Sequence, residues 1–285
     1  MAVNSKKDFG SPIGILIGFI VFLVGVYFQP SKANFIDNLS LFASFNSLVL
    51  VIGSTIAAAF VAIPASGIKT IPGVLSIIVR DLNFDYLGVI NQILNYATIG
   101  RKDGLFALEK EAQKIEDPFF ANYLEQATFE RDQKKLKSAM ELELNNISAR
   151  HEAGADLFTF MGTYAPAFGM MGTVMGLIIM MDGFTGTSGD VNVADKFGEL
   201  LGGMATALIT TFYGVISANL MFLPIAAKLE RRSENEIRHK QIVVEGIVMI
   251  HAGEHPILIK EKLMNFVPKE VKSSKEKAVK KQDSD

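Results

Sequence analysis

Residues 157–181 read LFTFMGTYAPAFGMMGTVMGLIIMM, and residues 200–227 read LLGGMATALITTFYGVISANLMFLPIAA. Neither stretch contains Asp, Glu, Lys or Arg, and each is long enough for a helix that crosses the roughly 30 Å of hydrocarbon in a membrane. Two further uncharged stretches, residues 9–31 and 38–68, come before them. The sequence therefore predicts an all-α, polytopic membrane protein with four transmembrane helices and a helical cytoplasmic domain.

The charged residues all lie outside these stretches, and their distribution predicts the side of the membrane that each segment occupies. Of the 28 Lys and Arg residues, 11 fall in residues 65–154 and 13 follow the fourth stretch, whereas each of the two short connections holds one. Cytoplasmic segments of membrane proteins carry an excess of Lys and Arg. Both termini and the middle segment are therefore expected in the cytoplasm.

Composition excludes several classes of protein. The chain has no Cys, which excludes a disulfide scaffold, a thiolate nucleophile and a Cys-ligated zinc site. A formal net charge of −2 argues against nucleic-acid binding. No phosphate-binding loop, nucleotide fingerprint or Ser-His-Asp arrangement is present, so the sequence does not predict an enzyme.

The pattern divides the chain into membrane and cytoplasmic segments. Five are predicted: residues 1–64 (transmembrane helices 1 and 2), 65–154 (cytoplasmic helical domain), 155–227 (transmembrane helices 3 and 4), 228–268 (cytoplasmic C-terminal helices) and 269–285 (disordered tail). In the middle segment, apolar residues recur every three or four positions at Leu105, Leu108, Ala112 and Ile115.

Two longer helices are predicted next to the membrane segments. The first runs from about Pro118 through Arg150 toward the third uncharged stretch, with no Gly or Pro until Gly154. The second covers residues 226–250 and is stopped by Gly253 and Pro256.

Small and polar residues form a helical stripe in each of the last two uncharged stretches. They are Gly162, Pro166, Gly169, Thr173 and Gly176 in one, and Gly203, Ala207, Thr210, Gly214, Ser217, Met221 and Pro224 in the other. Such stripes allow helices to approach closely in lipid. Alternatively, both stripes face a shared central element, where a carbonyl freed by Pro166 and the hydroxyls of Thr173, Thr210 and Thr211 offer the oxygen ligands that small cations take.

Ionisable side chains are absent from all four stretches; Asp156, Asp182 and Glu199 lie only at their borders. A path for protons or Na⁺ normally needs an ionisable group inside the membrane. If the protein conducts ions, the carboxylate must therefore come from a partner.

Several motifs resemble the MotA/PomA subunits of bacterial flagellar stators, in the MotA/TolQ/ExbB proton channel superfamily. They are YAPAFGMMGTVMGL at residues 164–177, ALITTFYG at 207–214, FLPIA at 222–226, RKDGLFALE at 101–109 and GEHP at 253–256. The resemblance runs from Arg101 to roughly Leu263, while the first two spans fit in placement more than in motif.

The resemblance implies a motor function in the bacterial inner membrane. In that family, five such subunits surround two MotB/PomB-type partners, and the single transmembrane helix of each partner supplies the Asp that takes up the ion. The residues that match Pro166 and Pro224 lie at the pore-side interface and affect coupling, and those that match Arg101 and Glu109 engage the rotor protein FliG. Without the resemblance, Arg101 and Glu109 read as an ordinary solvated surface.

The transported ion follows from the same resemblance. The pair Thr210-Thr211 together with Thr173 resembles the sodium-driven branch, so Na⁺ is favoured over H⁺, with Thr173 and Thr211 as the Na⁺ ligands. No cofactor other than the transported ion is expected. The sequence departs from the family at Ser44, where many members have an Asp near the channel entrance.

Other readings remain open from the sequence. One is a related energiser, such as ExbB/TolQ or an ion-driven gliding or phage-defence complex, and another is a passive membrane scaffold. Two spans before the large cytoplasmic segment argue against ExbB and TolQ. A metal site at His251 and His255, spaced i, i+4, is disfavoured because Gly253 breaks the helix between them.

Overall fold

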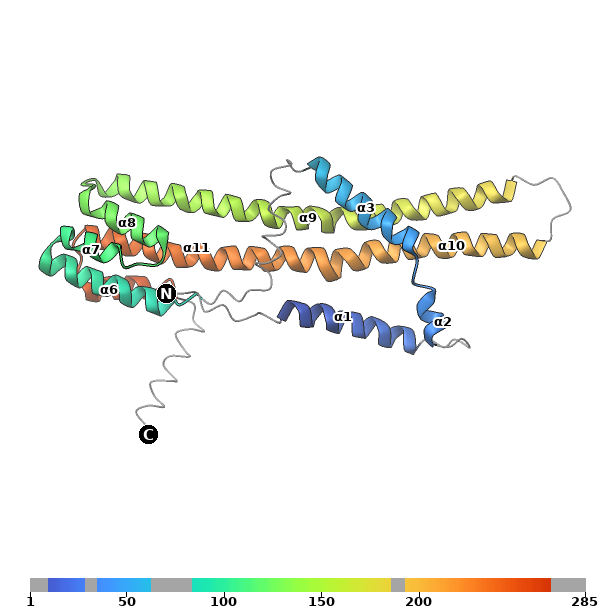
Figure 1. Cartoon of the computed structure of the whole chain (residues 1–285), viewed down its shortest axis with the longest axis horizontal. Coiled ribbons are helices and arrows are strands. Elements are labelled where there is room, and N and C mark those ends of the chain that lie inside the picture. Colours follow the sequence, from blue (N-terminus) through green and yellow to red (C-terminus); the bar gives the residue numbers. More distant parts are fainter. Residues whose placement is uncertain (1–9, 29–34, 63–83, 186–192, 268–285) are drawn as a thin grey trace, which may run out of the picture. The chain divides into compact units, whose positions relative to one another are not determined.

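The computed structural model describes residues 10–28, 35–62, 84–185 and 193–267. Every regular element in these ranges is a helix, and none of the ranges contains a strand, so the predicted all-α class is confirmed (Figure 1). The predicted tail at 269–285 lies outside the described residues.

The chain divides into two compact units. Described residues 84–151 and 231–267 belong to the first unit, and the second comprises Lys7–Asp81 and Glu152–Glu230. Helices α9 (Gln133–Thr185) and α11 (Leu223–His251) contribute residues to both units. The first unit also contains α6 (Tyr86–Asp103), η1 (Leu105–Ala107), α7 (Leu108–Ala112), α8 (Pro118–Phe129) and α12 (Pro256–Met264). The second also contains α1 (Gly10–Tyr27), α2 (Phe35–Ser40), α3 (Phe45–Ala62), α10 (Val193–Ile216) and the π-helix η2 (Ser217–Phe222).

Helices of the first unit begin at side chains that cap them. Asp85 accepts a hydrogen bond from the N–H of Gly88 at the start of α6, and Asp117 accepts one from Phe119 at the start of α8. The apolar faces of these helices meet α9, α11 and α12 in one core. Its fully buried members include Ile90, Ile93, Leu108, Phe120, Leu124, Met140, Ile242, Ile247, Ile259 and Leu263.

The structure corrects two of the predicted cytoplasmic helices. The helix predicted from Pro118 through Arg150 is interrupted, because α8 ends at Phe129 and α9 begins at Gln133. The carboxylate of Asp132 accepts a hydrogen bond from the N–H of Lys134 and so begins a new helix. The periodic segment beginning at Leu105 forms only a 3₁₀ turn and a short α7, which ends at Ala112.

The helix predicted over residues 226–250 is confirmed inside α11, and its end is where the sequence placed it. Gly253 adopts a φ of +69°, a conformation that a residue without Cβ adopts at no steric cost. Pro256 then begins α12.

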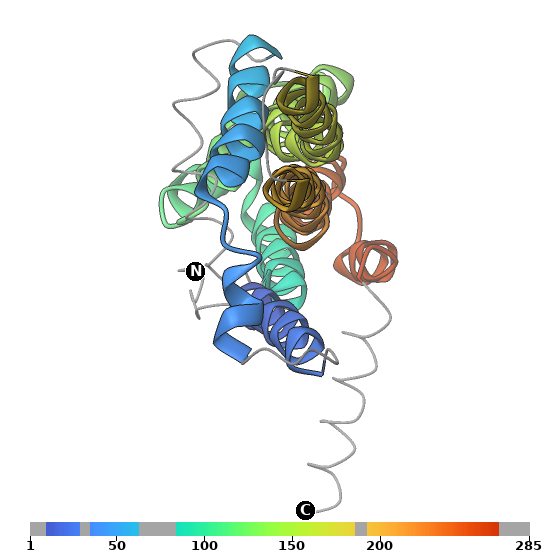
Figure 2. The same cartoon turned by 90° about the vertical axis from the view of Figure 1, so that its right-hand side faces the viewer.

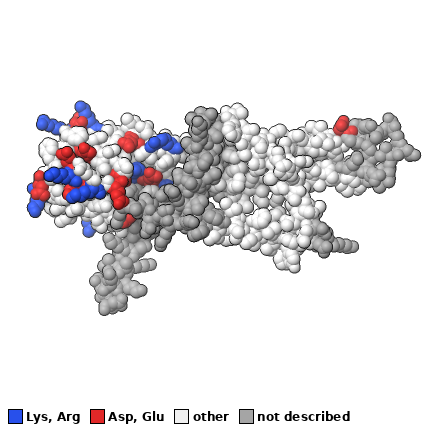
Figure 3. All heavy atoms as spheres, viewed as in Figure 1, with Lys and Arg blue, Asp and Glu red and all other residues white. Residues whose placement is uncertain are grey.

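Three helical segments in the described residues have the length and composition to cross a membrane: Phe45–Ala62, Gln133–Asp182 and Leu200–His251. A shorter apolar helix covers Ile13–Tyr27. Large apolar side chains of the second unit are exposed, among them Leu16, Val21, Phe60, Val61, Ile178 and Leu208. Figure 3 shows charged side chains gathered over the first unit, while the described surface of the second is almost free of them. The chain is a multi-pass membrane protein with a charged helical unit.

Candidate functional site

Helices α9 and α10 lie side by side and approach each other along their small residues (Figures 1 and 2). A Cβ atom built on Gly169 would lie 3.1 Å from the Cα atom of Thr211. A Cβ atom built on Gly176 would lie 3.0 Å from the Cβ atom of Ala207. The two stripes read from the sequence therefore face each other, in the close backbone contact that favours helix association in lipid.

Of the three predicted ion-path threonines, Thr210 and Thr211 lie on this contact, and Thr173 follows Gly172 in α9. Thr210 is 2% exposed and packs against Gly172, where a Cβ atom would lie 2.6 Å from the threonine oxygen. Its hydroxyl donates to the carbonyl three residues earlier at 2.6 Å, as does that of Thr173. Thr211 donates across to the carbonyl of Gly169 at 3.4 Å. Because a hydroxyl that donates one bond keeps two acceptor lone pairs, the oxygens of Thr173 and Thr211 retain the capacity to bind a cation. The Thr210 oxygen is buried against α9.

The two predicted coupling prolines sit in different backbone settings. Helix α9 continues through Pro166, whose Cα atom would lie 3.2 Å from a Cβ atom built on Gly214 of α10. Pro224 is exposed and is the second residue of α11, which follows η2, a six-residue π-helix. The hydroxyl of Ser217 donates to two carbonyls at the start of this π segment, at 2.7 and 3.1 Å. This π-helix was not predicted from the sequence, although a proline inside an apolar helix indicates a disturbed hydrogen-bond ladder.

Tyr213 belongs to the motif ALITTFYG at residues 207–214 but was not among the predicted site residues. Its hydroxyl donates to the carbonyl of Phe42 and accepts a hydrogen bond from the N–H of Ser44 at 3.2 Å. The Ser44 side chain in turn pairs with that of Ser47 at 2.8 Å in the first turn of α3. The N–H of Ser47 also donates to the Ser44 hydroxyl at 3.4 Å, so Ser44 occupies the capping position of α3.

The two predicted rotor-binding residues lie on either side of one turn. Arg101 is in the last turn of α6 and Glu109 in the first turn of α7, and Gly104, with a φ of +85°, lies between these helices. Both side chains are exposed, and neither forms an ion pair or a hydrogen bond with another described residue. The structure thus presents both charges on the surface of the first unit.

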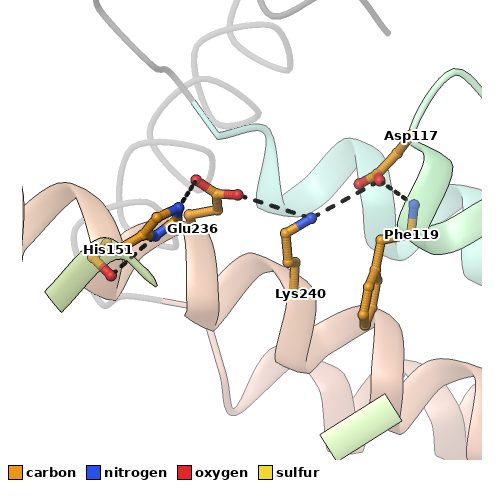
Figure 4. Close-up of polar contacts among 6 residues, drawn as sticks. Asp117, Phe119, His151, Glu236 and Lys240 are labelled. Atoms are coloured by element: carbon orange, nitrogen blue, oxygen red, sulfur yellow. Dashed lines mark hydrogen bonds and ion pairs between the residues drawn. The ribbon is translucent and has the colours of Figure 1, made fainter. Parts of the chain in front are cut away.

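A second group of charges in the first unit is more deeply packed (Figure 4). The Lys240 ammonium lies 4.0 Å from a carboxylate oxygen of Asp117, 3.9 Å from one of Glu236 and 4.9 Å from the centre of the Phe119 ring. Glu236 also lies 4.0 Å from an imidazole nitrogen of His151. These contacts hold the start of α8 against α11.

The imidazoles of His251 and His255 make separate hydrogen bonds. The imidazole of His251 is hydrogen-bonded to the carbonyl of Glu130 at 2.8 Å, and that of His255 accepts a bond from the N–H of Ile257 at 3.3 Å. Burial lowers the pKa of His239, with a smaller opposing effect from nearby carboxylates. Among the described residues no group of three or more His, Cys, Asp or Glu side chains is placed to hold a metal.

Comparison with known proteins gives one consistent result. Residues 111–242 match the MotA/TolQ/ExbB proton channel family. The chain is 33% identical to the uncharacterized protein YtxD of Bacillus subtilis over 96% of both chains, and 32% identical to Motility protein A of Borreliella burgdorferi over 91% of this chain and 94% of the relative. Its fold matches the flagellar MotAB stator complex from Bacillus subtilis with a TM-score of 0.80 and 27% identity, covering 94% of this chain and 99% of the other.

Proposed function

The chain belongs to the MotA/TolQ/ExbB proton channel family, and on that premise we propose that it is a stator subunit of a bacterial flagellar motor. The observation that carries the proposal is similarity along nearly the whole chain to Motility protein A and to a flagellar MotAB stator complex. The relative with a functional name is named for motility rather than for catalysis, so the proposal includes no enzymatic activity.

The proposed arrangement is a complex in the bacterial inner membrane. Each subunit crosses the membrane four times with both termini in the cytoplasm, and five subunits surround two MotB/PomB-type partners. The absence of Asp, Glu, Lys, Arg and His from residues 157–181 and 200–227 supports a partner that supplies the ion-binding Asp.

The proposed ion is Na⁺, and H⁺ is the alternative. Thr173 and Thr211 serve as ligands beside the partner carboxylate, and Thr210 holds the same turn of α10 against α9. Hydroxyl oxygens that keep acceptor lone pairs support this role, because Na⁺ must replace lost water with oxygen. Pro166 and Pro224 flank the path and couple ion passage to helix movement.

Torque then reaches the rotor through the cytoplasmic unit. A charge moving down the membrane potential releases about 2.3 kcal/mol per 100 mV, which is the energy available to each step. Exposed Arg101 and Glu109 engage the charged surface of the rotor protein FliG. Their lack of partners among the described residues supports this role, because no internal ion pair must break before they bind.

Swimming speed as a function of external Na⁺ tests the function. Cells that depend on this subunit and its partner are tracked at fixed pH while Na⁺ is varied, with and without a protonophore. Speed that follows Na⁺ and survives the protonophore supports the sodium-driven stator. Speed that ignores Na⁺ but is lost with the protonophore replaces Na⁺ by H⁺, and swimming that does not depend on the subunit favours the related non-flagellar energiser.

Two variants test the assigned residues against matched controls. Thr211→Ala is expected to abolish or greatly reduce torque without loss of assembly, whereas Thr206→Ala, an exposed threonine of the same helix, is expected to leave torque unchanged. Normal swimming of Thr211→Ala would remove the ligand role.

The second variant tests the rotor contact. Arg101→Glu is expected to impair swimming but not ion flow, and Lys102→Glu, the neighbouring exposed cation, is the control. Equal effects of the two charge reversals would contradict a specific rotor contact.

A further inference from the structure

We propose that Tyr213 is a positioning residue for the cation path, because its hydroxyl sets the rotation of α10 about its axis and thereby the direction of the Thr211 side chain. This inference rests on the proposed function of Thr211 as an ion ligand. It assigns to Tyr213 a role that does not require contact with the ion.

Tyr213 is hydrogen-bonded to the turn between α2 and α3. The Tyr213 hydroxyl donates to the carbonyl of Phe42 and accepts from the N–H of Ser44, so one side-chain oxygen pairs two backbone groups that belong to neither helix. Backbone groups without partners are costly in an apolar setting. The two hydrogen bonds therefore satisfy the backbone of the turn and at the same time fix the position of the Tyr213 hydroxyl.

Thr211 and Tyr213 lie on different sides of α10. Successive residues of an α-helix are about 100° apart, so Thr211 and Tyr213 point in nearly opposite directions. Thr211 faces α9, where its hydroxyl donates to Gly169. Phe212, which lies between them in sequence, packs with Phe22 of α1 at 5.1 Å and with Phe42 at 5.4 Å between ring centres.

Packing against α9 and the hydrogen bonds of Tyr213 both resist rotation of α10 about its axis. The contact with α9 seats residues of α10 against glycines of α9: Thr210 against Gly172, Ala207 against Gly176 and the Cα atom of Thr211 against Gly169. Hydrogen bonds weaken steeply as their angle departs from linearity. The two bonds of Tyr213 therefore add a directional restraint to the packing against α9, and they act on a different side of α10.

Loss of the hydroxyl should weaken cation binding rather than stop the motor. In Tyr213→Phe the ring remains, but Thr211 samples more orientations and the site is less preorganised. We expect the half-saturating cation concentration for swimming to rise about 3- to 10-fold, the effect of one net hydrogen bond, with a smaller change in maximal speed.

The experiment compares Tyr213→Phe with Tyr27→Phe. Tyr27 lies in α1, is 67% exposed and forms no hydrogen bond with another described residue. Speed is measured across external Na⁺ concentrations, together with the membrane abundance of each variant. An unchanged half-saturating concentration in Tyr213→Phe, or a loss of speed that only follows reduced abundance, would overturn the proposal.

A double variant tests whether Tyr213 acts through Thr211. Thr211→Ser keeps the hydroxyl but removes the methyl group that restricts it, so its effect and that of Tyr213→Phe should be non-additive. Additive shifts would mean that the two residues act independently and would contradict the positioning role.

The inference can also be tested if the chain does not drive swimming. If swimming follows H⁺ instead of Na⁺, Thr211 has no ligand role, and the inference fails together with the proposed ion. If the chain powers no swimming, the proposed function fails, and Na⁺-induced thermal stabilisation of the purified complex tests Tyr213 instead. Tyr213→Phe should then need more Na⁺ than the unmodified chain for equal stabilisation, and equal requirements or no stabilisation at all would refute the inference.

Discussion

Replacing Gly214 by Ala tests the contact on which the ion-path site is built. The added Cβ atom would lie 2.7 Å from the carbonyl oxygen of Ala165, 3.1 Å from the Cα atom of Gly169 and 3.2 Å from that of Pro166. All three atoms belong to the backbone of α9, so no side chain can rotate away. Gly202 of the same helix has no heavy atom within 4 Å of a Cβ at its position, and Gly202→Ala is the matched control.

The magnitude follows from these distances. Carbon atoms in contact are normally about 3.5–4.0 Å apart, so α9 and α10 must separate by about 0.5 Å or more. A gap of that size forfeits roughly a quarter to a half of the contact energy along the shared stripe, and overpacking of this kind typically costs about 1–3 kcal/mol. Ala is favoured over Gly in a helix by about 1 kcal/mol, but both variants gain this equally. Gly214→Ala should therefore be about 1–3 kcal/mol less stable than Gly202→Ala.

Thermal unfolding of the purified protein in detergent measures this difference, and membrane abundance gives a second reading in cells. Gly202→Ala should match or exceed the stability of the unmodified chain, while Gly214→Ala should fall below it. Equal stability of the two variants would refute the close approach of α9 and α10.

Three other predictions concern packing and charge. The chain has no native Cys, so Gly176→Cys with Ala207→Cys should form a disulfide within one chain: the two Cβ positions are 3.0 Å apart, and a small separation of the helices brings them to the roughly 3.5–4.5 Å of a disulfide. Val174→Cys with Ala207→Cys should not form one, and non-reducing gel mobility distinguishes the two pairs. Burial lowers the pKa of His239 below its usual 6.5, so the unfolded chain takes up a proton that the folded chain does not, and stability should fall as the pH drops below 6.5. His239→Gln should flatten that dependence in thermal unfolding. Lys240→Met should cost about 1–2 kcal/mol and Lys262→Met less than about 1 kcal/mol, although Lys262 has the shorter ion pair at 2.8 Å, because the Lys240 side chain is 13% exposed and that of Lys262 is 58% exposed.

Each of these has a result that would count against it. Equal cross-linking of both cysteine pairs would mean that α9 does not present Gly176 to α10. An unchanged pH dependence in His239→Gln would move the effect to other groups, and a larger loss in Lys262→Met than in Lys240→Met would show that distance matters more than burial in this unit.

Local features of the sequence predicted much of the fold. The uncharged stretches at 157–181 and 200–227 correspond to apolar parts of α9, α10 and α11. Gly253 and Pro256 end one helix and begin the next, because a positive φ and a missing N–H act on their own backbone. Sequence periodicity also identified the two stripes of small residues, although it could not say whether they face each other.

Other features depend on partners far away in the chain and needed the tertiary structure. The break between α8 and α9 is stabilised by His251, which is 121 residues from Glu130 in sequence, and Tyr213 pairs with Phe42 across 171 residues.

The sequence by itself therefore determined the apolar helices, the charged segments and the motifs of the family, because length, charge and helical period act within a few turns of one segment. Only the tertiary structure decided that Gly169 meets Thr211, that Thr210 is buried, and that Tyr213 ties α10 to the turn before α3. These contacts join segments that are distant in sequence, and their energies depend on distances and angles that exist only once the helices have packed.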